Sequence, residues 1–296
     1  MLGEHIERYR EDGFCVVPDI APPATLARMN AILADLVERS RAVTAHDDVY
    51  DLEPGHSSAV PRVRRIKKPT NVDRVFAELV RSPAMTAVLR ALLGPAARLH
   101  GSKLNLKAPG FGSPVEWHQD WAFYPHTNDD VLAIGVMLED IGLDNGPMLI
   151  VPGSHRGPTY DHHADGAYFC GAIDPAKAGV DFASAVPVIG KAGAASFHHV
   201  RAVHGSGQNT STRPRPFLLY EVTAADAFPL MGVPDYDDFH GRMLYGEDTI
   251  EPRTVSCPVR MPLPPAPNQG SIYENQTAVA NRYFEFKLAT RESAAT

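Results

Sequence analysis

Glu116-Trp117-His118-Gln119-Asp120 is the stretch on which the interpretation of this chain depends, and His204-Gly205-Ser206-Gly207 is its distant counterpart. In an extended strand, residues i and i+2 point to the same side, so His118 and Asp120 would share one face. A second imidazole, supplied by His204, would complete a set of two histidines and one carboxylate. Such a set is the facial triad that holds non-haem Fe(II) and leaves coordination positions open. The pattern therefore predicts an iron site made of these three residues.

An arginine follows the second histidine at a suitable distance. After His204, a Gly/Ser turn leads to Arg213-Pro214-Arg215. A guanidinium binds a carboxylate through two parallel hydrogen bonds, which fix both its position and its orientation. An arginine beyond the second histidine therefore suits a dicarboxylate that lies on the metal.

At these residues the chain resembles the phytanoyl-CoA dioxygenase family of Fe(II)/2-oxoglutarate oxygenases. The likeness runs from about Arg64 to about Val222. In the family's motif His155 falls in a structural turn, which leaves His204 as the second metal ligand. The motifs that carry the likeness are Trp117-His118-Gln119-Asp120, Glu139-Asp140 with Asn145-Gly146, Val151-Pro152-Gly153-Ser154-His155-Arg156-Gly157 and His204-Gly205-Ser206-Gly207.

The resemblance implies a mainly β fold with flanking helices, in the form of a double-stranded β-helix, the jelly-roll or cupin-like barrel. We expect residues 1–296 to form a single domain. Within it, residues 1–95 would be a helical flank, residues 96–223 the barrel core and residues 224–296 a C-terminal cover.

The resemblance also implies the chemistry. Fe(II), the cosubstrate 2-oxoglutarate and O2 would oxidise a C–H bond of a small organic molecule and release succinate and CO2. Halogenating relatives replace the carboxylate ligand by a small residue, so Asp120 favours hydroxylation or a related C–H oxidation. Arg215 and Ser206 would bind the far carboxylate of 2-oxoglutarate, and Asn105 and Arg65 would be further cosubstrate contacts.

The loop after the metal strand contains the candidate substrate residues Trp121, Phe123 and Tyr124. Plain packing is the alternative for such aromatics, but loops that leave a site often carry its substrate contacts. Gly135 stands where the family usually carries a bulky aromatic residue. Either this opens space in the pocket, or a neighbouring chain segment fills it. Open space would suit a substrate with a sizeable apolar portion.

The segment Ala97 to Lys107 is predicted to be a strand in which Lys103, Asn105 and Lys107 alternate with leucines. The polar side of such a strand usually faces water, whereas in the family it lines the iron pocket. Asn105 is therefore the preferred cosubstrate contact on this strand.

Several histidines are not expected to bind metal. His162 and His163 are adjacent, as are His198 and His199. Adjacent residues of a strand point to opposite sides and seldom bind one ion together. Nearby, Val186 to Ile189 and Ala194 to Phe197 are predicted to be two strands of a hairpin, with Gly190-Lys191-Ala192-Gly193 as its turn.

Composition restricts the class of protein. The chain has 296 residues, of which 44% are hydrophobic and 21% charged, with a net charge of -7. This balance is that of an ordinary globular protein, and the net negative charge argues against binding to nucleic acid or anionic membrane. The expected partner is a small-molecule substrate, and the expected state is a monomer or homodimer. Three cysteines without a C-x-x-C motif and a charged N-terminus predict a cytoplasmic location. No apolar run approaches the roughly 20 residues of a membrane helix.

Three alternatives remain at this point. A zinc hydrolase could use the same three ligands with a bound water, but it would have no use for Arg215. A cupin-like module that binds metal without catalysis is the second alternative. An interaction protein without metal is the third.

Overall fold

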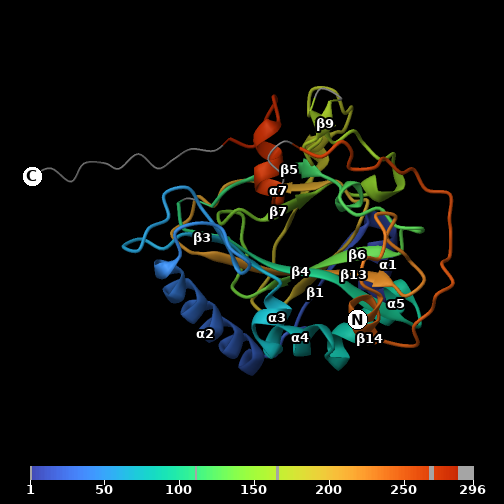
Figure 1. The fold of residues 1–296 in the computed structure, drawn as a ribbon, viewed down its shortest axis with the longest axis horizontal. Coiled ribbons are helices and arrows are strands. Elements are labelled where there is room, and N and C mark those ends of the chain that lie inside the picture. The colour runs from blue at the N-terminus through green and yellow to red at the C-terminus, as the bar shows by residue number, and fades with distance from the viewer. Residues whose placement is uncertain (1, 111, 165–166, 267–269, 286–296) are drawn as a thin grey trace, which may run out of the picture.

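Two antiparallel β-sheets and a set of outer helices make up the structure, a computed structural model that describes residues 2–110, 112–164, 167–266 and 270–285. Figure 1 shows β4, β6 and β13 crossing the centre of the molecule, with β5 and β7 above them and α2 to α5 below. The molecule is therefore mainly β with flanking helices, in the arrangement of a jelly roll.

The larger sheet has eight strands, and its pairs are antiparallel. Every residue of its strands β6 and β13 is buried, because helices or loops cover one side of the sheet and the barrel interior covers the other. The strands, in spatial order, are β1 (Phe14–Val17), β11 (Ala195–His199), β6 (Val131–Met137), β13 (Arg215–Ala224), β4 (Ala97–Lys107), β3 (Val63–Lys67) and β2 (Tyr50–Leu52), with β14 (Met243–Tyr245) also paired to β4.

The smaller sheet has four strands, in the order β10 (Val186–Val188), β7 (Met148–Ile150), β12 (His204–Ser206) and β5 (Val115–His118). It brings the two histidine-bearing motifs side by side, because β12 pairs with β5. A separate two-stranded ribbon, β8 (His163–Ala164) with β9 (Tyr168–Phe169), lies outside both sheets.

The hairpin predicted around Gly190 to Gly193 is wrong, although both of its strands exist. β10 pairs with β7 in the smaller sheet, and β11 pairs with β6 and β1 in the larger sheet. The short turn therefore carries the chain from one sheet to the other. Periodicity identifies a strand, but it does not say which strand will be its neighbour.

The helices of the N-terminal third cover the larger sheet. Ser82 caps α5 by accepting a hydrogen bond from the Met85 N–H, and Pro83 occupies the first turn, where proline is tolerated. The same third of the chain supplies β1, β2 and β3, so it is more than a helical flank. The helices are α1 (Leu2–Asp12), α2 (Pro23–Arg39), α3 (Pro69–Val72), α4 (Arg74–Val80) and α5 (Pro83–Leu93), and short 3-10 turns are η1 (Ser40–Ala42), η2 (Asp120–Ala122), η3 (Ser154–Arg156), η4 (Phe182–Ser184) and η5 (Gln276–Ala278).

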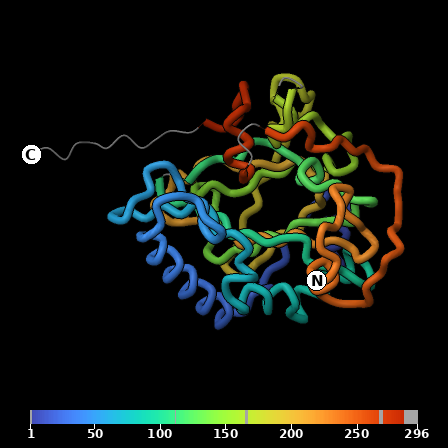
Figure 2. The backbone as a smooth tube through the Cα atoms, viewed as in Figure 1, coloured from blue at the N-terminus to red at the C-terminus, as the bar shows by residue number. Residues whose placement is uncertain are grey.

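The C-terminal segment runs along the outside of the barrel. After α6 (Tyr236–Gly241) and β14, the chain follows one edge of the molecule, drawn in orange to red in Figure 2. It then reaches α7 (Ile272–Asn275), which lies over the smaller sheet near β5 and β7 (Figure 1). Residues 267–269 and 286–296 of the expected C-terminal cover lie outside the described residues.

Gly135 opens no space in the barrel. A Cβ atom built on Gly135 would lie 2.0 Å from Cζ of Phe217 and 2.6 Å from its Cε1. The Phe217 ring, on the neighbouring strand β13, occupies the volume that a side chain at position 135 would need. Of the two alternatives for Gly135, the structure shows the filled one.

This contact makes a stability prediction. Gly135→Ala should lower the free energy of unfolding by roughly 1–3 kcal/mol, because the added methyl overpacks the core against a ring. Gly3→Ala is the matched control, since a Cβ at Gly3 meets nothing within 4 Å. Denaturant unfolding of both variants is the measurement. Adding Phe217→Leu should recover part of the loss, and an unchanged Gly135→Ala would contradict the packing argument.

Candidate active site

The structure brings His118, Asp120 and His204 together. His204 lies directly opposite His118 in the pairing of β12 with β5. Asp120 begins the turn η2 immediately after β5, and one ligand atom from each residue lies within 4.8 Å of the others. His118 Nε2 is 3.7 Å from Asp120 Oδ1. His155, the competing histidine, lies in η3, where its ring packs against Gly13 and His199 instead.

Backbone carbonyls orient both imidazoles. His118 Nδ1 is 2.8 Å from the Glu116 carbonyl oxygen, and His204 Nδ1 is 3.0 Å from the Ala202 carbonyl oxygen. A carbonyl oxygen can only accept a hydrogen bond, so each Nδ1 must carry the proton. The lone pair of each Nε2 is then free to face a metal, which is the usual tautomer of a metal-binding histidine.

Protonation states also suit a divalent cation. Burial, with a contribution from His204, lowers the pKa of His118 well below its usual value, and burial lowers the pKa of His204 to about 4. Burial alone would raise the pKa of Asp120. The nearby His198, His204 and Lys103 outweigh it, so the pKa of this carboxyl lies well below its ordinary range. At neutral pH the site therefore presents two neutral imidazoles and a carboxylate, which a metal binds without displacing protons.

His198 is a site residue that sequence reasoning missed. Its Nε2 lies 3.7 Å from Asp120 Oδ2, and its ring centroid is 4.7 Å from that of His204. The expectation that adjacent histidines do not bind one ion together does not exclude a role for one of them. In β11 the alternation turns His198 into the barrel, whereas His199 packs outside against Tyr9 and His155. The alternation of side chains along this predicted strand was the sequence signal that could have identified His198.

A cavity of about 60 Å³ adjoins the three ligands. The alternating polar residues of β4 face this cavity and not water, because they belong to the inward row of the barrel. The pairing of β4 with β13 sets Lys107 opposite Arg215, Asn105 opposite Phe217, and Lys103 opposite Leu219. The lining residues are Lys103, Asn105, Lys107, Val115, His118, Asp120, Ala133, Met148, His198, His204, Gly205, Ser206, Arg215, Phe217, Leu219, Ile272 and Tyr273.

One end of the cavity is cationic. Lys107 Nζ donates to Ser206 Oγ at 2.9 Å and to the Gly207 carbonyl oxygen. Arg215 is buried, its guanidinium donates to the Gly146 carbonyl at 2.9 Å, and its Nε has no partner. Among the described residues, neither cation forms an ion pair. Burial lowers the pKa of Arg215 to about 10, and burial with the Arg215 charge lowers the pKa of Lys107 well below its usual value.

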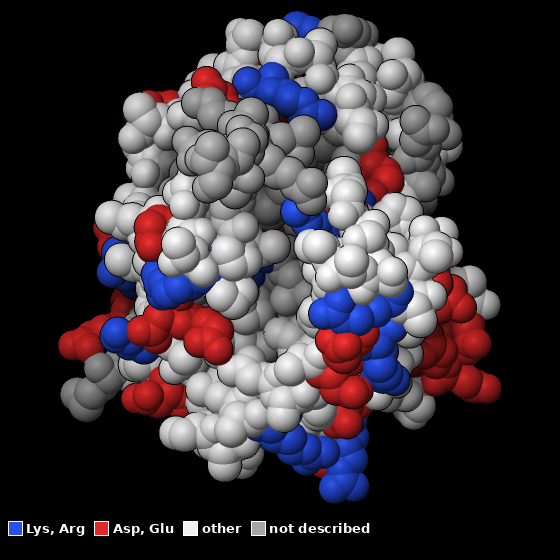
Figure 3. All heavy atoms as spheres, turned by 90° about the vertical axis from the view of Figure 1, so that its left-hand side faces the viewer, with Lys and Arg blue, Asp and Glu red and all other residues white. Residues whose placement is uncertain are grey.

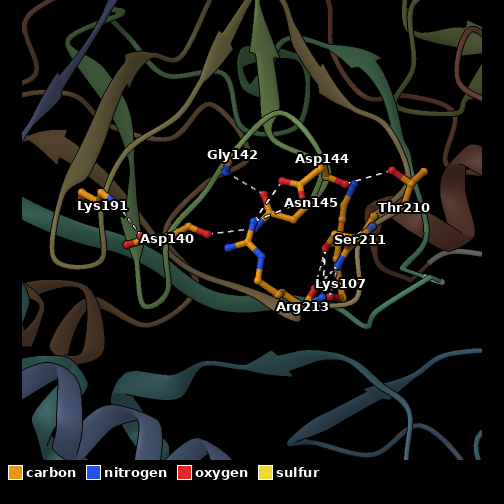
Figure 4. A network of polar contacts seen from close by, with 10 residues as sticks. Lys107, Asp140, Gly142, Asp144, Asn145, Lys191, Thr210, Ser211 and Arg213 are labelled. Carbon is orange, nitrogen blue, oxygen red and sulfur yellow. Dashed lines mark hydrogen bonds and ion pairs between the residues drawn. The ribbon is translucent and has the colours of Figure 1, made fainter.

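Arg213 has a different environment from Arg215, although only Pro214 separates them. Its guanidinium donates to Asp144 Oδ1 at 3.0 Å, and both side chains are about half exposed. Figure 4 shows this pair beside Asn145, which donates to the Asp140 carbonyl at 2.9 Å. Asn145 thereby holds the turn whose next residue, Gly146, presents its carbonyl to Arg215. Arg213, which precedes β13, thus lies at the surface, whereas Arg215, the first residue of β13, lines the cavity.

The other expected cosubstrate contacts differ in position. Asn105 lines the cavity, and its buried Oδ1 has no hydrogen-bond partner. Ser206 lines it too, and because its Oγ accepts from Lys107, its own hydroxyl proton remains available to an anion. Arg65 does not line this cavity, since its guanidinium pairs with Asp51 on the adjacent strand β2.

The expected substrate residues separate into two groups. Trp121 is fully buried in the core and donates to the Pro258 carbonyl at 2.8 Å, so it packs and does not line the cavity. Phe123 and Tyr124 line a second cavity of about 330 Å³ next to the first. The Phe123 ring lies edge-on to His118 at 5.9 Å, and burial together with nearby Asp120 raises the pKa of the Tyr124 phenol.

Part of the segment expected to be a C-terminal cover reaches the cavity, although the sequence did not say which of its residues would do so. Ile272 and Tyr273 of α7 belong to the lining. Tyr273 lies 4.6 Å beneath the Arg64 guanidinium, which also pairs with Glu274. Further on, Gln276 Oε1 accepts from the Glu116 N–H at 2.9 Å, in the strand that carries His118. Irregular segments of this kind carry no periodicity from which a partner could be inferred.

The family model for phytanoyl-CoA dioxygenase matches residues 9–217 of the chain. The chain belongs to the phytanoyl-CoA dioxygenase family. It is similar to a protein of Stutzerimonas stutzeri named "Probable alpha-ketoglutarate-dependent hypophosphite dioxygenase", at 36% identity over 96% of this chain and 100% of the relative. It is also 29% identical to an ectoine dioxygenase of Bordetella bronchiseptica, over 74% of this chain and 75% of the relative.

Solved structures of this family have the same fold. EctD from S. alaskensis, crystallised with 2-oxoglutarate and 5-hydroxyectoine, matches with a TM-score of 0.63 and 26% identity over 75% of this chain and 76% of that one. The same enzyme with bound Fe matches with the same TM-score at 25% identity. This phytanoyl-CoA dioxygenase family member is accordingly a 2-oxoglutarate-dependent non-haem iron dioxygenase, with Fe(II) as its metal, and the zinc hydrolase alternative is set aside.

The cavity of this family member fits its cosubstrate. The metal end offers two Nε2 lone pairs and a carboxylate, and the opposite end offers a buried guanidinium whose Nε is unpartnered. A buried cation without a counter-ion is costly unless a ligand supplies the opposite charge. A dicarboxylate that reaches from the metal to Arg215 would supply it. Bound there, Fe(II), 2-oxoglutarate and O2 provide the oxidising chemistry, and the protein provides orientation and exclusion of water.

We predict that the two arginines differ in their effect on the cosubstrate. Arg215→Ala should weaken 2-oxoglutarate binding by about 30-fold or more, because it removes a buried charged hydrogen-bond donor worth about 2 kcal/mol. Arg213→Ala is the matched control and should change binding less than about twofold, since Arg213 pairs with exposed Asp144. Calorimetric titration of the anaerobic Fe(II) protein measures both. The opposite pattern would assign the cosubstrate to Arg213.

A second prediction concerns pH. Burial lowers the pKa to about 4 for His162 and His204, and to about 3 for His126 and His199, from an ordinary 6.5. Between about pH 6.5 and 4 the unfolded chain therefore binds protons that the folded protein excludes. The free energy of unfolding of the metal-free protein should fall across this window, by up to about 1.4 kcal/mol per pH unit for each histidine. Unfolding curves from pH 7.5 to 4.5 test this, and a His126→Gln variant should show a shallower slope. Constant stability from pH 7 to 5 would contradict the prediction.

Proposed function

We propose that this dioxygenase binds Fe(II) through His118, Asp120 and His204, and holds the far carboxylate of 2-oxoglutarate with Arg215 and Ser206. The observation that carries this assignment is the burial of Arg215 in the cavity that the three proposed metal ligands also line, without a carboxylate partner among the described residues. Lys107 supports it by fixing the Ser206 hydroxyl. Asn105, between the two ends, is the further cosubstrate contact.

We further propose that the substrate is a compact anion, with hypophosphite as the leading candidate. The relative named for hypophosphite oxidation aligns over nearly the full length of both chains, whereas the ectoine dioxygenase aligns over about three quarters. The identity with that relative is also higher. A substrate of few atoms replaces the earlier expectation of a sizeable apolar portion, which rested on open space at Gly135.

The size of the cavity supports a compact substrate. Its volume is about 60 Å³, and one water needs about 10–15 Å³ on the same measure. On that measure the cavity holds about four to six waters, so little room is left once Fe(II) and 2-oxoglutarate are bound. The remaining space suits a molecule with a few non-hydrogen atoms, and hypophosphite has three.

The proposed reaction balances without any further reagent. Hypophosphite has two P–H bonds, and oxidation converts one of them into P–OH, which gives phosphite. One atom of O2 enters phosphite and the other enters succinate as 2-oxoglutarate loses CO2. The P–H bond and 2-oxoglutarate each supply two electrons, so the four-electron reduction of O2 is complete. The oxidised bond is then P–H in place of the C–H bond first expected.

An organic substrate is the second candidate, and one observation favours it. Phe123 and Tyr124 line the neighbouring cavity of about 330 Å³, which could receive the body of a larger molecule. The ectoine dioxygenase relatives and an L-proline trans-4-hydroxylase of Streptomyces griseoviridis, 28% identical over 75% of this chain, are named for substrates of that size. In this alternative, the aromatic loop after β5 would be the specificity element, as the sequence predicts.

A substrate comparison tests the proposal. The Fe(II)-loaded protein should release succinate with hypophosphite and form phosphite in a one-to-one ratio, followed by phosphorus NMR. Ectoine and L-proline should give only the slow background release of succinate. His204→Ala should abolish both products, because it removes a proposed metal ligand. Succinate release coupled to hydroxylated ectoine or proline, and not to phosphite, would move the assignment to the second candidate.

Cellular context is proposed on simpler grounds. The three cysteines Cys15, Cys170 and Cys257 are free, which fits a reducing cytoplasm. Among the described residues no helix is long and apolar enough to cross a membrane. On the face shown in Figure 3, basic and acidic side chains lie interspersed, which fits a protein that acts on a small molecule and not on a polyanion. We propose that it acts as a monomer or homodimer.

A further inference from the structure

The cavity holds a third cation, Lys103, at the end nearer the metal. Lys103, Asn105 and Lys107 belong to one inward row of β4, but the two lysines lean apart. Lys107 Nζ donates to Ser206 and Gly207, toward Arg215. Lys103 Nζ lies 2.8 Å from Oε1 of Glu221, which stands opposite Gly101, two residues farther from Lys107.

One cosubstrate molecule cannot use both cationic ends. Four residues of a strand span about 13 Å, at about 3.3 Å for each residue. The carbon chain of 2-oxoglutarate has four C–C bonds of about 1.5 Å and so reaches at most about 6 Å. With the far carboxylate at Arg215 and Lys107, no second carboxylate of the same molecule remains for a lysine that leans away from them.

Lys103 lies close to the metal ligands. It lines the same cavity as His118, Asp120 and His204, and it pairs with Glu221 on the side away from Lys107. Burial lowers the pKa of Lys103 itself, but Glu221 and Asp120 outweigh burial and the net pKa is raised, so the ammonium is charged at neutral pH. An ammonium has three donors, and Glu221 engages one of them.

The balance of charge in the loaded cavity also points to an anion. On the positive side are Fe(II) with two charges and the three basic side chains of the lining with one each. On the negative side are Asp120, Glu221 and the two carboxylates of 2-oxoglutarate. The sum leaves one positive charge, which a monoanion would neutralise in a site of low dielectric.

We propose that Lys103, positioned by Glu221, binds the oxygens of the substrate and makes the site selective for a compact monoanion. The inference rests on the proposed function, because it assigns a residue to the substrate of the same site. Bound through its oxygens to the ammonium, tetrahedral hypophosphite presents its P–H bonds away from Lys103. Glu221 acts through Lys103 as a positioning residue, and Lys103 itself contacts the substrate.

The test uses Lys103→Met, which keeps most of the length of the side chain and removes its charge. In the Fe(II)-loaded full-length protein, KM for hypophosphite should rise about 10- to 100-fold, as expected for loss of a charged hydrogen bond. The KM for 2-oxoglutarate should change less than about threefold, and succinate release should exceed phosphite formation. Lys103→Arg should recover most of the affinity, and Glu221→Gln should give an intermediate loss of hypophosphite affinity.

Lys191→Met is the matched control, since Lys191 also pairs with a carboxylate, that of Asp140, but its side chain is 88% exposed at the surface. It should leave every constant unchanged. A Lys103→Met variant with a lower melting temperature and an unchanged KM for hypophosphite would show that the pair is only structural and overturn the inference. A rise confined to the KM for 2-oxoglutarate would overturn it as well.

Failure of the proposed function gives a different result. Calorimetry of hypophosphite and phosphite with the anaerobic Fe(II)–2-oxoglutarate protein measures anion binding without turnover. Wild-type protein that binds these anions through Lys103 but forms no phosphite would contradict the function and support the anion site. If the wild-type protein forms phosphite and the Lys103→Met variant has the same KM for hypophosphite, the result would support the function and overturn the anion site. Absence of binding and turnover in the wild type would overturn both.

Discussion

The pairing of β5 with β12 is the constraint on which the active site depends. It sets His204 opposite His118, although 86 residues separate them in the chain, and the carbonyls of Glu116 and Ala202 then fix both rings through Nδ1. Because side chains alternate along a strand, a slip of one residue would turn His204 to the other face of the sheet. The metal site is therefore not an addition to the barrel. It exists only in the register that the rest of the smaller sheet enforces.

The same dependence explains how far the sequence could be interpreted. The triad, the arginine proposed for the cosubstrate and the positions of many strands along the chain follow from local spacing and from the family's motifs. What the sequence lacked was information about neighbours in space. The strands on either side of Gly190 joined different sheets, the Phe217 ring filled the space beside Gly135, and Tyr273 arrived from a segment without periodicity. His198 was missed for a related reason. The rule that adjacent histidines seldom bind one ion together concerns the pair, and it does not exclude that one of them faces the site.

In the protein without ligands, the burial of two basic side chains at one end of the cavity lowers the stability of the fold. Lys107 and Arg215 are buried opposite each other; burial lowers the pKa of both, and the Arg215 charge lowers that of Lys107 further. Removing a charge from water costs several kcal/mol unless a partner compensates it. The barrel can bear this cost because Arg215 and Lys107 form the first pair of the long antiparallel ladder between β13 and β4. A dicarboxylate therefore enters a site that is already arranged for it.

Specificity follows from how the same two strands distribute charge along the barrel. At one end, Lys107 and Arg215 lack carboxylate partners among the described residues, so this end favours a ligand with a full negative charge. Nearer the metal, Glu221 already neutralises Lys103, so this part of the cavity favours an anion only once Fe(II) has added its own charges. The proposed compact anion would therefore gain most when the metal and the cosubstrate are already in place.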